Sequence, residues 1–191
     1  MPNLCDYSMK IVGRKEDIAD FIEVMQCDYD YENYEFSFNR HMGGRVFEAI
    51  EDSEGITLEN GKYSIEIYGN CAWSVQACMT DGNFTYYKEF KDEYGDNSRS
   101  TTLQLESERL HLDIEVYSNE IGIGFQEHYL IKEGHTKISE SVDFSAYCIE
   151  DYETKEEAEL DNDLTITDEE WSDNDGYIYR GGFKNYGVFS I

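Results

Sequence analysis

Hydrophobic and polar residues alternate along most of this chain with the periods of strands and helices. In residues 4–12 every second residue from Cys5 to Ile11 is apolar, which predicts a strand that ends at Gly13. Residues 15–27 follow with apolar side chains at i, i+3, i+4 and i+7. That spacing predicts an amphipathic helix.

The same two periods predict further elements downstream. Strands are expected at 45–51, 63–68, 111–117, 121–132 and 136–149, a further helix at 100–109 and the opening of another at 71–79. Asn60-Gly61 is a typical two-residue hairpin turn. The last residues, 177–191, regain strand character and are expected to close the sheet.

This order of elements predicts one α+β domain. We expect a ferredoxin-like antiparallel sheet with two helices on one face, formed by residues 1–149 with an insertion at 79–99. Residues 150–191 are expected to add an acidic excursion and the closing strand. Residues 150–175 contain thirteen acidic residues and a single lysine.

The net charge of the chain restricts the partners that it can bind. The chain has 42 Asp and Glu residues against 15 Lys and Arg residues, and its formal charge is −27. Such a surface repels phosphate backbones and anionic membranes, so we expect no direct binding to nucleic acid or lipid headgroups. Basic proteins and cations are the partners that it favours.

The five cysteines indicate a reducing compartment. Their number is odd and no two form a C-x-x-C motif, which is typical of buried, reduced thiols. The first residues do not contain a basic segment followed by an apolar segment, as a signal peptide would. No apolar run approaches the length of a membrane span. We therefore expect a cytoplasmic protein.

Three segments resemble a known family. They are the start Met1-Pro2-Asn3-x-Cys5, the stretch from Ile65 to Trp73, and the stretch from Leu112 to Phe125. Together they are similar to the YubB ferredoxin-like family, which bacterial plasmids and phages encode, over about residues 1–25 and 63–135. Leu4 stands where that family has Trp, and no proline follows Trp73. The resemblance implies a ferredoxin-like fold and a mobile-element origin. It implies no catalytic residue, because the family has no established activity.

Common catalytic and metal-binding motifs are not found. Cys71 and Cys78 lack structural-zinc spacing, and the four histidines are scattered. An EF-hand with Gly176 at its sixth position would have Trp171 at the first and Gly182 at the twelfth, so it fails. There is no G-x-S-x-G, P-loop or dinucleotide-binding motif. We therefore predict no enzyme, no metal and no cofactor.

Rows of acidic residues are the remaining candidate site. Side chains at i and i+2 of a strand lie roughly 6.5–7 Å apart on one face, close to the spacing of phosphates along a nucleic acid. Interleaved tyrosines would add stiff interface contacts. The predicted partner-binding residues are Asp28, Tyr29, Asp30, Tyr31, Glu32, Tyr34, Glu35, Asp113, Glu115, Glu156, Glu157, Glu159, Asp161, Asp163, Asp168, Glu169, Glu170, Asp173 and Asp175.

These rows lead to a functional hypothesis. The chain is predicted to be a phage or mobile-element protein that mimics nucleic acid and inhibits a basic host nucleic-acid-binding defence protein, such as a CRISPR effector. Two alternatives stay open. One is a structural or housekeeping phage or plasmid protein that is acidic for solubility, and the other is a module that binds divalent cations weakly.

Overall fold

The computed structural model describes residues 3–27, 29–30, 35–36, 40–42, 46–51, 54–80, 100–172 and 176–191. For 29–30 and 35–36 it describes the backbone alone. The elements in chain order are β1 (Leu4–Gly13), α1 (Lys15–Met25), β2 (Tyr29–Asp30), β3 (Glu35–Phe36), β4 (Val46–Glu51), β5 (Ile56–Thr57), β6 (Tyr63–Ala72), α2 (Val75–Met79), α4 (Leu103–Leu110), β7 (Asp113–Glu120), β8 (Phe125–Lys132), β9 (His135–Cys148), α5 (Lys155–Asn162), α6 (Asp168–Ser172) and β10 (Tyr177–Gly181).

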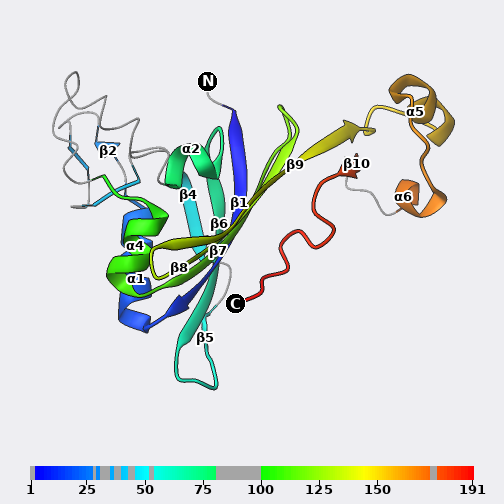
Figure 1. Cartoon of the computed structure of the whole chain (residues 1–191). Helices are drawn as coiled ribbons and strands as arrows, with labels where there is room; N and C mark the ends of the chain where they lie inside the picture. The colour runs from blue at the N-terminus through cyan, green and yellow to red at the C-terminus, as the bar shows by residue number, and fades with distance from the viewer. Residues whose placement is uncertain are drawn as a thin grey trace.

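One eight-stranded sheet organises the molecule (Figure 1). Its strands follow the order β10-β9-β8-β7-β1-β6-β4, with β5 paired to β6, and each of these pairs is antiparallel. The strand β1 lies inside the sheet between β6 and β7. A separate antiparallel pair joins β2 and β3.

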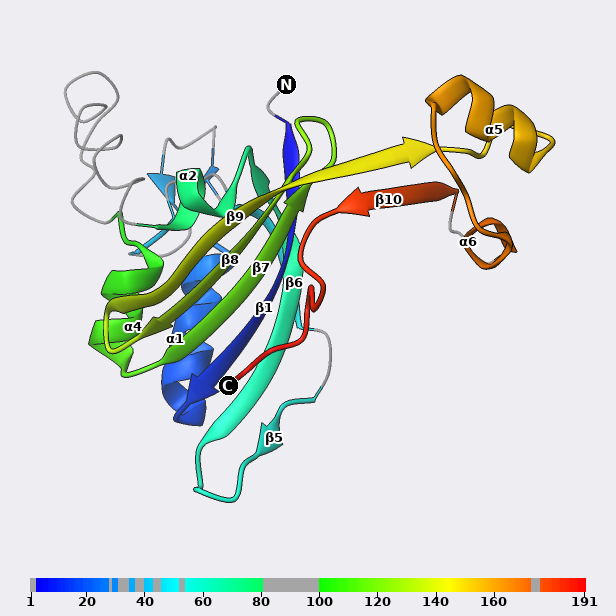
Figure 2. The ribbon, with the colours of Figure 1, turned by 45° about the vertical axis from the view of Figure 1, so that its right-hand side comes forward.

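The main core lies between this sheet and its helices. Every second residue of β1 from Cys5 to Ile11 is buried, as the alternation predicted. Ile18 and Phe21 of α1 and Leu103 of α4 pack into the same cluster. The predicted helical spacing therefore places the apolar side of α1 against the sheet, and α1 and α4 lie on the same face (Figure 2).

The predicted ferredoxin-like fold is wrong. That fold is a small antiparallel sheet built from two β-α-β units, whose two helices connect the strands. Here the antiparallel sheet has eight strands, and it continues from β1 and β7 through β8, β9 and β10 on one side. Residue periodicity shows that a segment is a strand but not which strand it pairs with, and this is why the prediction failed.

Several boundaries also differ from the prediction. The expected strand at 121–132 begins only at Phe125, because residues 121–124 form the turn between β7 and β8. Gly124 has φ +88° there, which glycine adopts at low cost. The helix expected at 71–79 is the short α2, since β6 continues to Ala72. Most of the expected insertion, 81–99, lies outside the described residues.

Only the first part of the C-terminal stretch forms the predicted closing strand. The strand β10 extends the sheet through β9, but residues 183–191 form no strand. They lie over the sheet face that α1 and α4 leave open, where the Tyr117 hydroxyl donates to the Val188 carbonyl (3.3 Å) and Lys10 Nζ lies 6.0 Å from the Phe189 ring centre. We call residues 183–191 the C-terminal strap. None of the helices in the described ranges combines the length and the apolar character that crossing a bilayer requires.

Candidate functional site: an acidic arm

The strand β9 is long enough to extend beyond the rest of the sheet. We call that sheet, together with α1, α2 and α4, the body. Its first part pairs with β8, and its last residues, Phe144 to Cys148, pair with β10. The segment between β9 and β10 folds into α5 and α6 beyond the edge of the body (Figures 1 and 2). We call residues 150–172 the acidic arm, because they contain eleven acidic residues and one lysine.

The arm has a hydrophobic cluster of its own. Ile149, Ala158, Ile166 and Ile178 are nearly fully buried together, and Tyr147, Tyr152, Leu164 and Trp171 pack around them. At the base of the arm, the rings of Phe144 and Tyr179 stack with their centres 5.5 Å apart. Packed side chains therefore give the arm a defined shape.

Local signals fix where α5 begins and ends. The Thr154 hydroxyl accepts a hydrogen bond from the Glu157 N–H (3.3 Å), as an N-cap residue does. At the other end Asp163 adopts the left-handed conformation (φ 51°), which Asp tolerates better than most residues. The Leu164 N–H then donates to the Glu159 carbonyl (3.0 Å). The acidic sequence thus forms a short, capped helix.

Four carboxylates of the arm hold its parts together. Glu159 accepts from the Ile166 N–H (2.7 Å), Asp161 from the Tyr152 hydroxyl (2.5 Å), Asp168 from Lys155 Nζ, and Glu170 from Arg180 Nη1 (2.7 Å). The hydrogen bond from Lys155 lowers the pKa of Asp168. The N–H of Thr167, together with Arg180, lowers the pKa of Glu170.

The other carboxylates of the arm face solvent. Glu150, Asp151, Glu153, Glu156, Glu157, Asp163 and Glu169 are all exposed, and no hydrogen bond or ion pair joins their side chains to the described part of the chain. Lys155 and Arg180, the two cations at this site, are already paired within it. The outer surface of the arm is therefore strongly negative.

The predicted site residues thus separate into groups. Among those on the arm, Glu156, Glu157, Asp163 and Glu169 point outward, whereas Glu159, Asp161, Asp168 and Glu170 also serve the arm's own structure. Asp173 and Asp175 lie outside the described residues, as do Asp28, Tyr31, Glu32 and Tyr34. Tyr29 and Asp30 form β2 and pair with Phe36 and Glu35 of β3, with their side chains not described.

The structure contradicts the prediction that Asp113 and Glu115 of β7 are both exposed. Asp113 is half-buried, and its carboxylate lies 3.4 Å from Lys62 Nζ. Glu115 is completely buried. It does lie on the sheet face opposite the helices, as the alternation predicted, but the C-terminal strap covers that face. Glu115 is therefore removed from the candidate surface.

The contacts of Glu115 form a site that the sequence did not reveal. One carboxylate oxygen lies 2.9 Å from His128 Nε2. The other accepts from the Ser190 N–H (2.6 Å), the Ser190 hydroxyl (3.0 Å) and the Ile191 N–H (3.2 Å). His128 also stacks on Tyr117, with ring centres 4.0 Å apart. The buried carboxylate thus pins the strap to the sheet.

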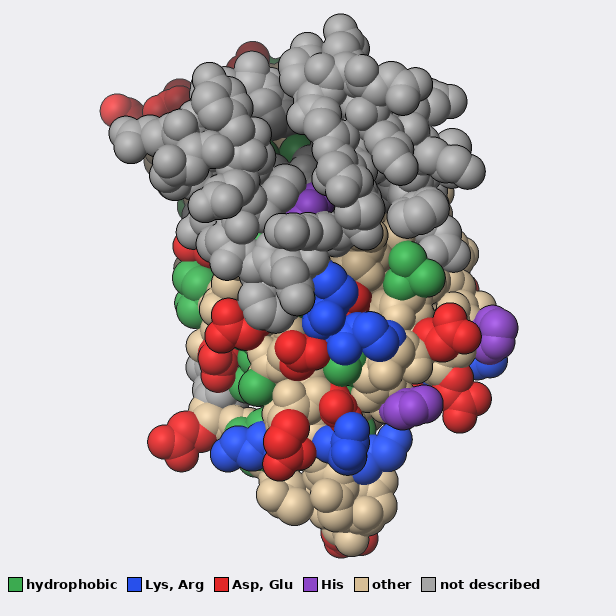
Figure 3. Space-filling view, turned by 90° about the vertical axis from the view of Figure 1, so that its left-hand side faces the viewer, with side chains coloured by type: hydrophobic (Ala, Val, Ile, Leu, Met, Phe, Trp, Pro, Cys, Tyr) green, Lys and Arg blue, Asp and Glu red, His purple; other side chains and the backbone are tan. Residues whose placement is uncertain are grey.

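On the described part of the helical face of the body, acidic side chains are mixed with basic ones. Figure 3 shows Lys and Arg side chains interspersed with Asp and Glu over this face. Asp20 lies 3.0 Å from both Arg40 and Arg109, and Arg109 also pairs with Glu106 (2.6 Å). Burial opposes the ionisation of Asp20, but the two arginines outweigh it and lower the pKa. The charges here neutralise one another.

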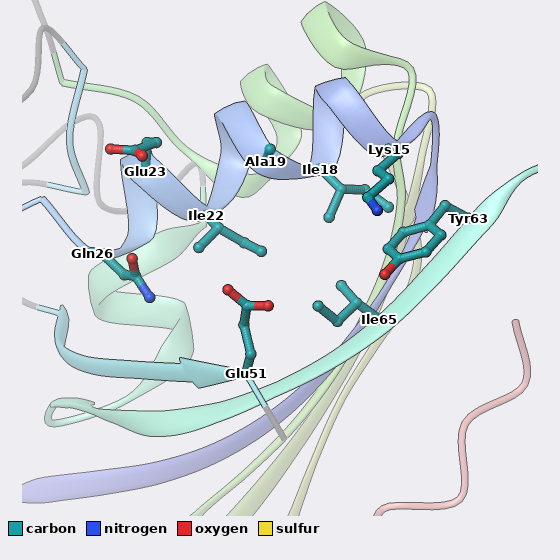
Figure 4. A pocket seen from close by; sticks show the side chains of 9 residues that line it. All are labelled: Lys15, Ile18, Ala19, Ile22, Glu23, Gln26, Glu51, Tyr63 and Ile65. Atoms are coloured by element: carbon teal, nitrogen blue, oxygen red, sulfur yellow. The ribbon is translucent and has the colours of Figure 1, made fainter. Parts of the chain in front are cut away.

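A shallow pocket of about 210 Å³ opens between α1 and the nearby ends of β4 and β6 (Figure 4). Its apolar residues are Ile18, Ala19, Ile22 and Ile65, and its polar residues are Lys15, Glu23, Gln26, Glu51 and Tyr63. Lys15 Nζ lies 5.1 Å from the Tyr63 ring centre, and Gln26 donates to the Ala49 carbonyl (2.9 Å). Because these polar groups hold α1 against the sheet edge, we assign the pocket no function.

The five thiols differ in their exposure to solvent. Cys5, Cys27, Cys71 and Cys78 are buried, as predicted, whereas Cys148 is exposed. Hydrogen bonds with Cys5 and Cys78, together with burial, raise the pKa of Cys71, which disfavours the reactive thiolate. Among the described residues, no group of three or more His, Cys, Asp or Glu is arranged to hold a metal ion.

Comparison of the chain with protein-family models, with curated proteins and with solved structures finds no match in any of the three. The resemblance to the YubB ferredoxin-like family stays a prediction from three sequence segments.

Proposed function

We propose that this chain is a non-enzymatic acidic binding protein that mimics nucleic acid. Its arm enters the basic groove of a host nucleic-acid-binding defence protein, such as a CRISPR effector, and excludes the DNA or RNA. The proposal includes a phage or mobile-element origin and action in the cytoplasm of a bacterial host. The observation that carries it is the folded arm, whose outward carboxylates form no ion pair with any cation in the described part of the chain.

Two physical properties of the arm support this function. Its own hydrophobic cluster and caps order the carboxylates before binding, so little conformational entropy is lost on association. Its position beyond the edge of the body makes it accessible to a concave partner (Figure 2). Carboxylates bound in a groove would release the anions of a basic partner, as phosphates do, and would speed the encounter electrostatically.

A competition experiment tests the function directly. The probes are a Cas9-type nuclease loaded with guide RNA, a helix-turn-helix repressor and a restriction endonuclease, each holding a fluorescent target DNA. Increasing amounts of the chain should release DNA from at least one of them. The inhibition should weaken steeply between about 50 mM and about 200 mM salt, because the interaction is electrostatic.

Charge reversal on the arm supplies the matched control. Glu156→Lys combined with Glu157→Lys should abolish the inhibition. Glu54→Lys combined with Glu59→Lys changes the net charge equally at exposed positions of the body near β5 and should leave most of it. Inhibition that is insensitive to salt, or equally sensitive to both double variants, would contradict the role of the arm. Release from none of the probes would favour an acidic surface that serves solubility.

A further inference from the structure

Four large apolar side chains are exposed at one end of the sheet. Leu4 is 56% exposed, Trp73 42%, Ile121 45% and Ile123 67%. We call these four residues the end patch. Single exposed apolar residues are ordinary on protein surfaces, whereas several at one place mark contact sites.

The antiparallel topology brings the four residues together. β1 begins, β6 ends and β7 turns into β8 at the same end of the sheet. The Trp73 N–H donates to the Asn3 carbonyl (2.8 Å), and Gly122 lies beside the Asn3 amide. Figures 1 and 2 both show the N-terminal end of β1 next to the β7–β8 turn.

The backbone at Trp73 is unusual. Its φ of 67° lies in the left-handed region, which a bulky residue rarely adopts. A half-exposed indole, and not glycine, occupies this position. Tryptophan is also the residue type most enriched among the energetic anchors of interfaces.

The end patch lies near the base of the acidic arm. β9 ends at the same end of the sheet, and the Phe144 N–H at the base of the arm donates to the Gly124 carbonyl in the β7–β8 turn (2.9 Å). Four side chains supply much less contact area than the roughly 800 Å² that each partner contributes to a stable interface. The patch therefore needs a neighbouring contact surface, and the arm is that surface.

Charge identifies the occupant. A second copy of the chain would bring another −27 charges to the contact, and like charges at an interface oppose association. A basic protein surface is complementary to the nearby arm. An anionic membrane or a nucleic acid would be repelled.

We propose that the end patch is the apolar anchor of the interface through which the arm holds its partner, with Trp73 as its centre. The partner then presents an apolar pocket beside a basic groove. This inference rests on the proposed function and adds to it a contact that salt does not weaken. The arm supplies long-range attraction, and Trp73 and Ile123 supply the short-range contact.

Selection from a phage-displayed library of random peptides on the immobilised full chain tests the anchor. The enriched peptides should combine Lys or Arg with aromatic or large aliphatic residues. Trp73→Ala and Ile123→Ala should each weaken their binding about tenfold, as expected for interface anchors. Ile56→Ala, at a 60% exposed isoleucine near the opposite end of the sheet, should change it less than about twofold.

Two further variants distinguish the loss of the apolar anchor from the loss of folding and from the loss of charge. Trp73→Gly removes the indole and suits the left-handed backbone, so it should keep the unfolding temperature while losing the peptides. Glu156→Gln combined with Glu157→Gln should weaken the same peptides at low salt and have little effect at high salt. No enriched peptide, or peptides that Trp73→Gly and Ile123→Ala leave bound, would overturn the anchor. Peptides that need the arm carboxylates but not Trp73 would leave the proposed function standing alone.

Discussion

The sheet body and the acidic arm use the same side chains in opposite ways. Glu106, Glu115, Glu120 and Glu127 of the body are buried, and hydrogen bonds satisfy each carboxylate. The arm directs most of its carboxylates into solvent. The same residue type therefore has two roles in this chain: a carboxylate inside a hydrogen-bonded shell stabilises the fold, whereas most carboxylates of the arm remain exposed to solvent, as the proposed function requires.

Removal of a buried body carboxylate should have the largest effect. Glu115→Ala leaves His128 and the N–H groups of Ser190 and Ile191 without their acceptor, and should lower the free energy of unfolding by about 3–5 kcal/mol. Urea denaturation measures this loss, and hydrogen exchange should show residues 183–191 unprotected. Glu140→Ala, at an exposed carboxylate 3.8 Å from the other nitrogen of the His128 ring, is the control and should have little effect. A strap that stays protected in Glu115→Ala would show that other contacts hold it.

Truncation in the arm's cluster should act locally. Ile178→Ala should cost about 2 kcal/mol and expose the amides of α5 and α6 to hydrogen exchange, while the body keeps its protection. Ile114→Ala removes the same groups from the main core and should destabilise the whole chain. Equal loss of protection throughout the chain in both variants would mean that the arm is not a separate stability unit.

The buried Glu127 should give a stability effect that depends on pH. Burial raises the pKa of Glu127, and hydrogen bonds from Ser118 and the Val75 N–H oppose that rise only in part. The folded state therefore holds this proton more tightly than the unfolded state. Its contribution to stability is lost as pH rises from about 4.5 through the raised folded pKa. Glu127→Gln should gain stability relative to the native chain over that window in urea titrations.

Neutralisation of outward arm carboxylates should have the smallest effect on stability. Glu156→Gln combined with Glu157→Gln should shift the free energy of unfolding by about 0.5 kcal/mol or less per site, because both side chains face solvent. Thermal unfolding of this variant beside Glu54→Gln combined with Glu59→Gln checks the estimate. If only the arm variant lost several kcal/mol of unfolding free energy, these carboxylates would stabilise the fold, as the buried carboxylates of the body do.

The sequence by itself determined the local elements. Alternation over residues 4–12 and the helical spacing after Lys15 placed β1 and α1, and both elements bury the predicted side chains. Asn60-Gly61 marked the hairpin between β5 and β6, and Gly61 has the positive φ that such a turn needs. These signals are local, because each depends on residues that are near one another along the chain.

Tertiary structure alone decided the pairing of the strands and the fate of each acidic residue. Glu115 and Glu157 both read as polar surface positions, yet the strap buries the first and the second faces solvent. Likewise, Leu4, Trp73 and Ile123 are far apart in sequence and become neighbours only because β1, β6 and β7 run antiparallel. Burial and neighbourhood depend on contacts between distant segments, and residue periodicity carries no information about which segments meet.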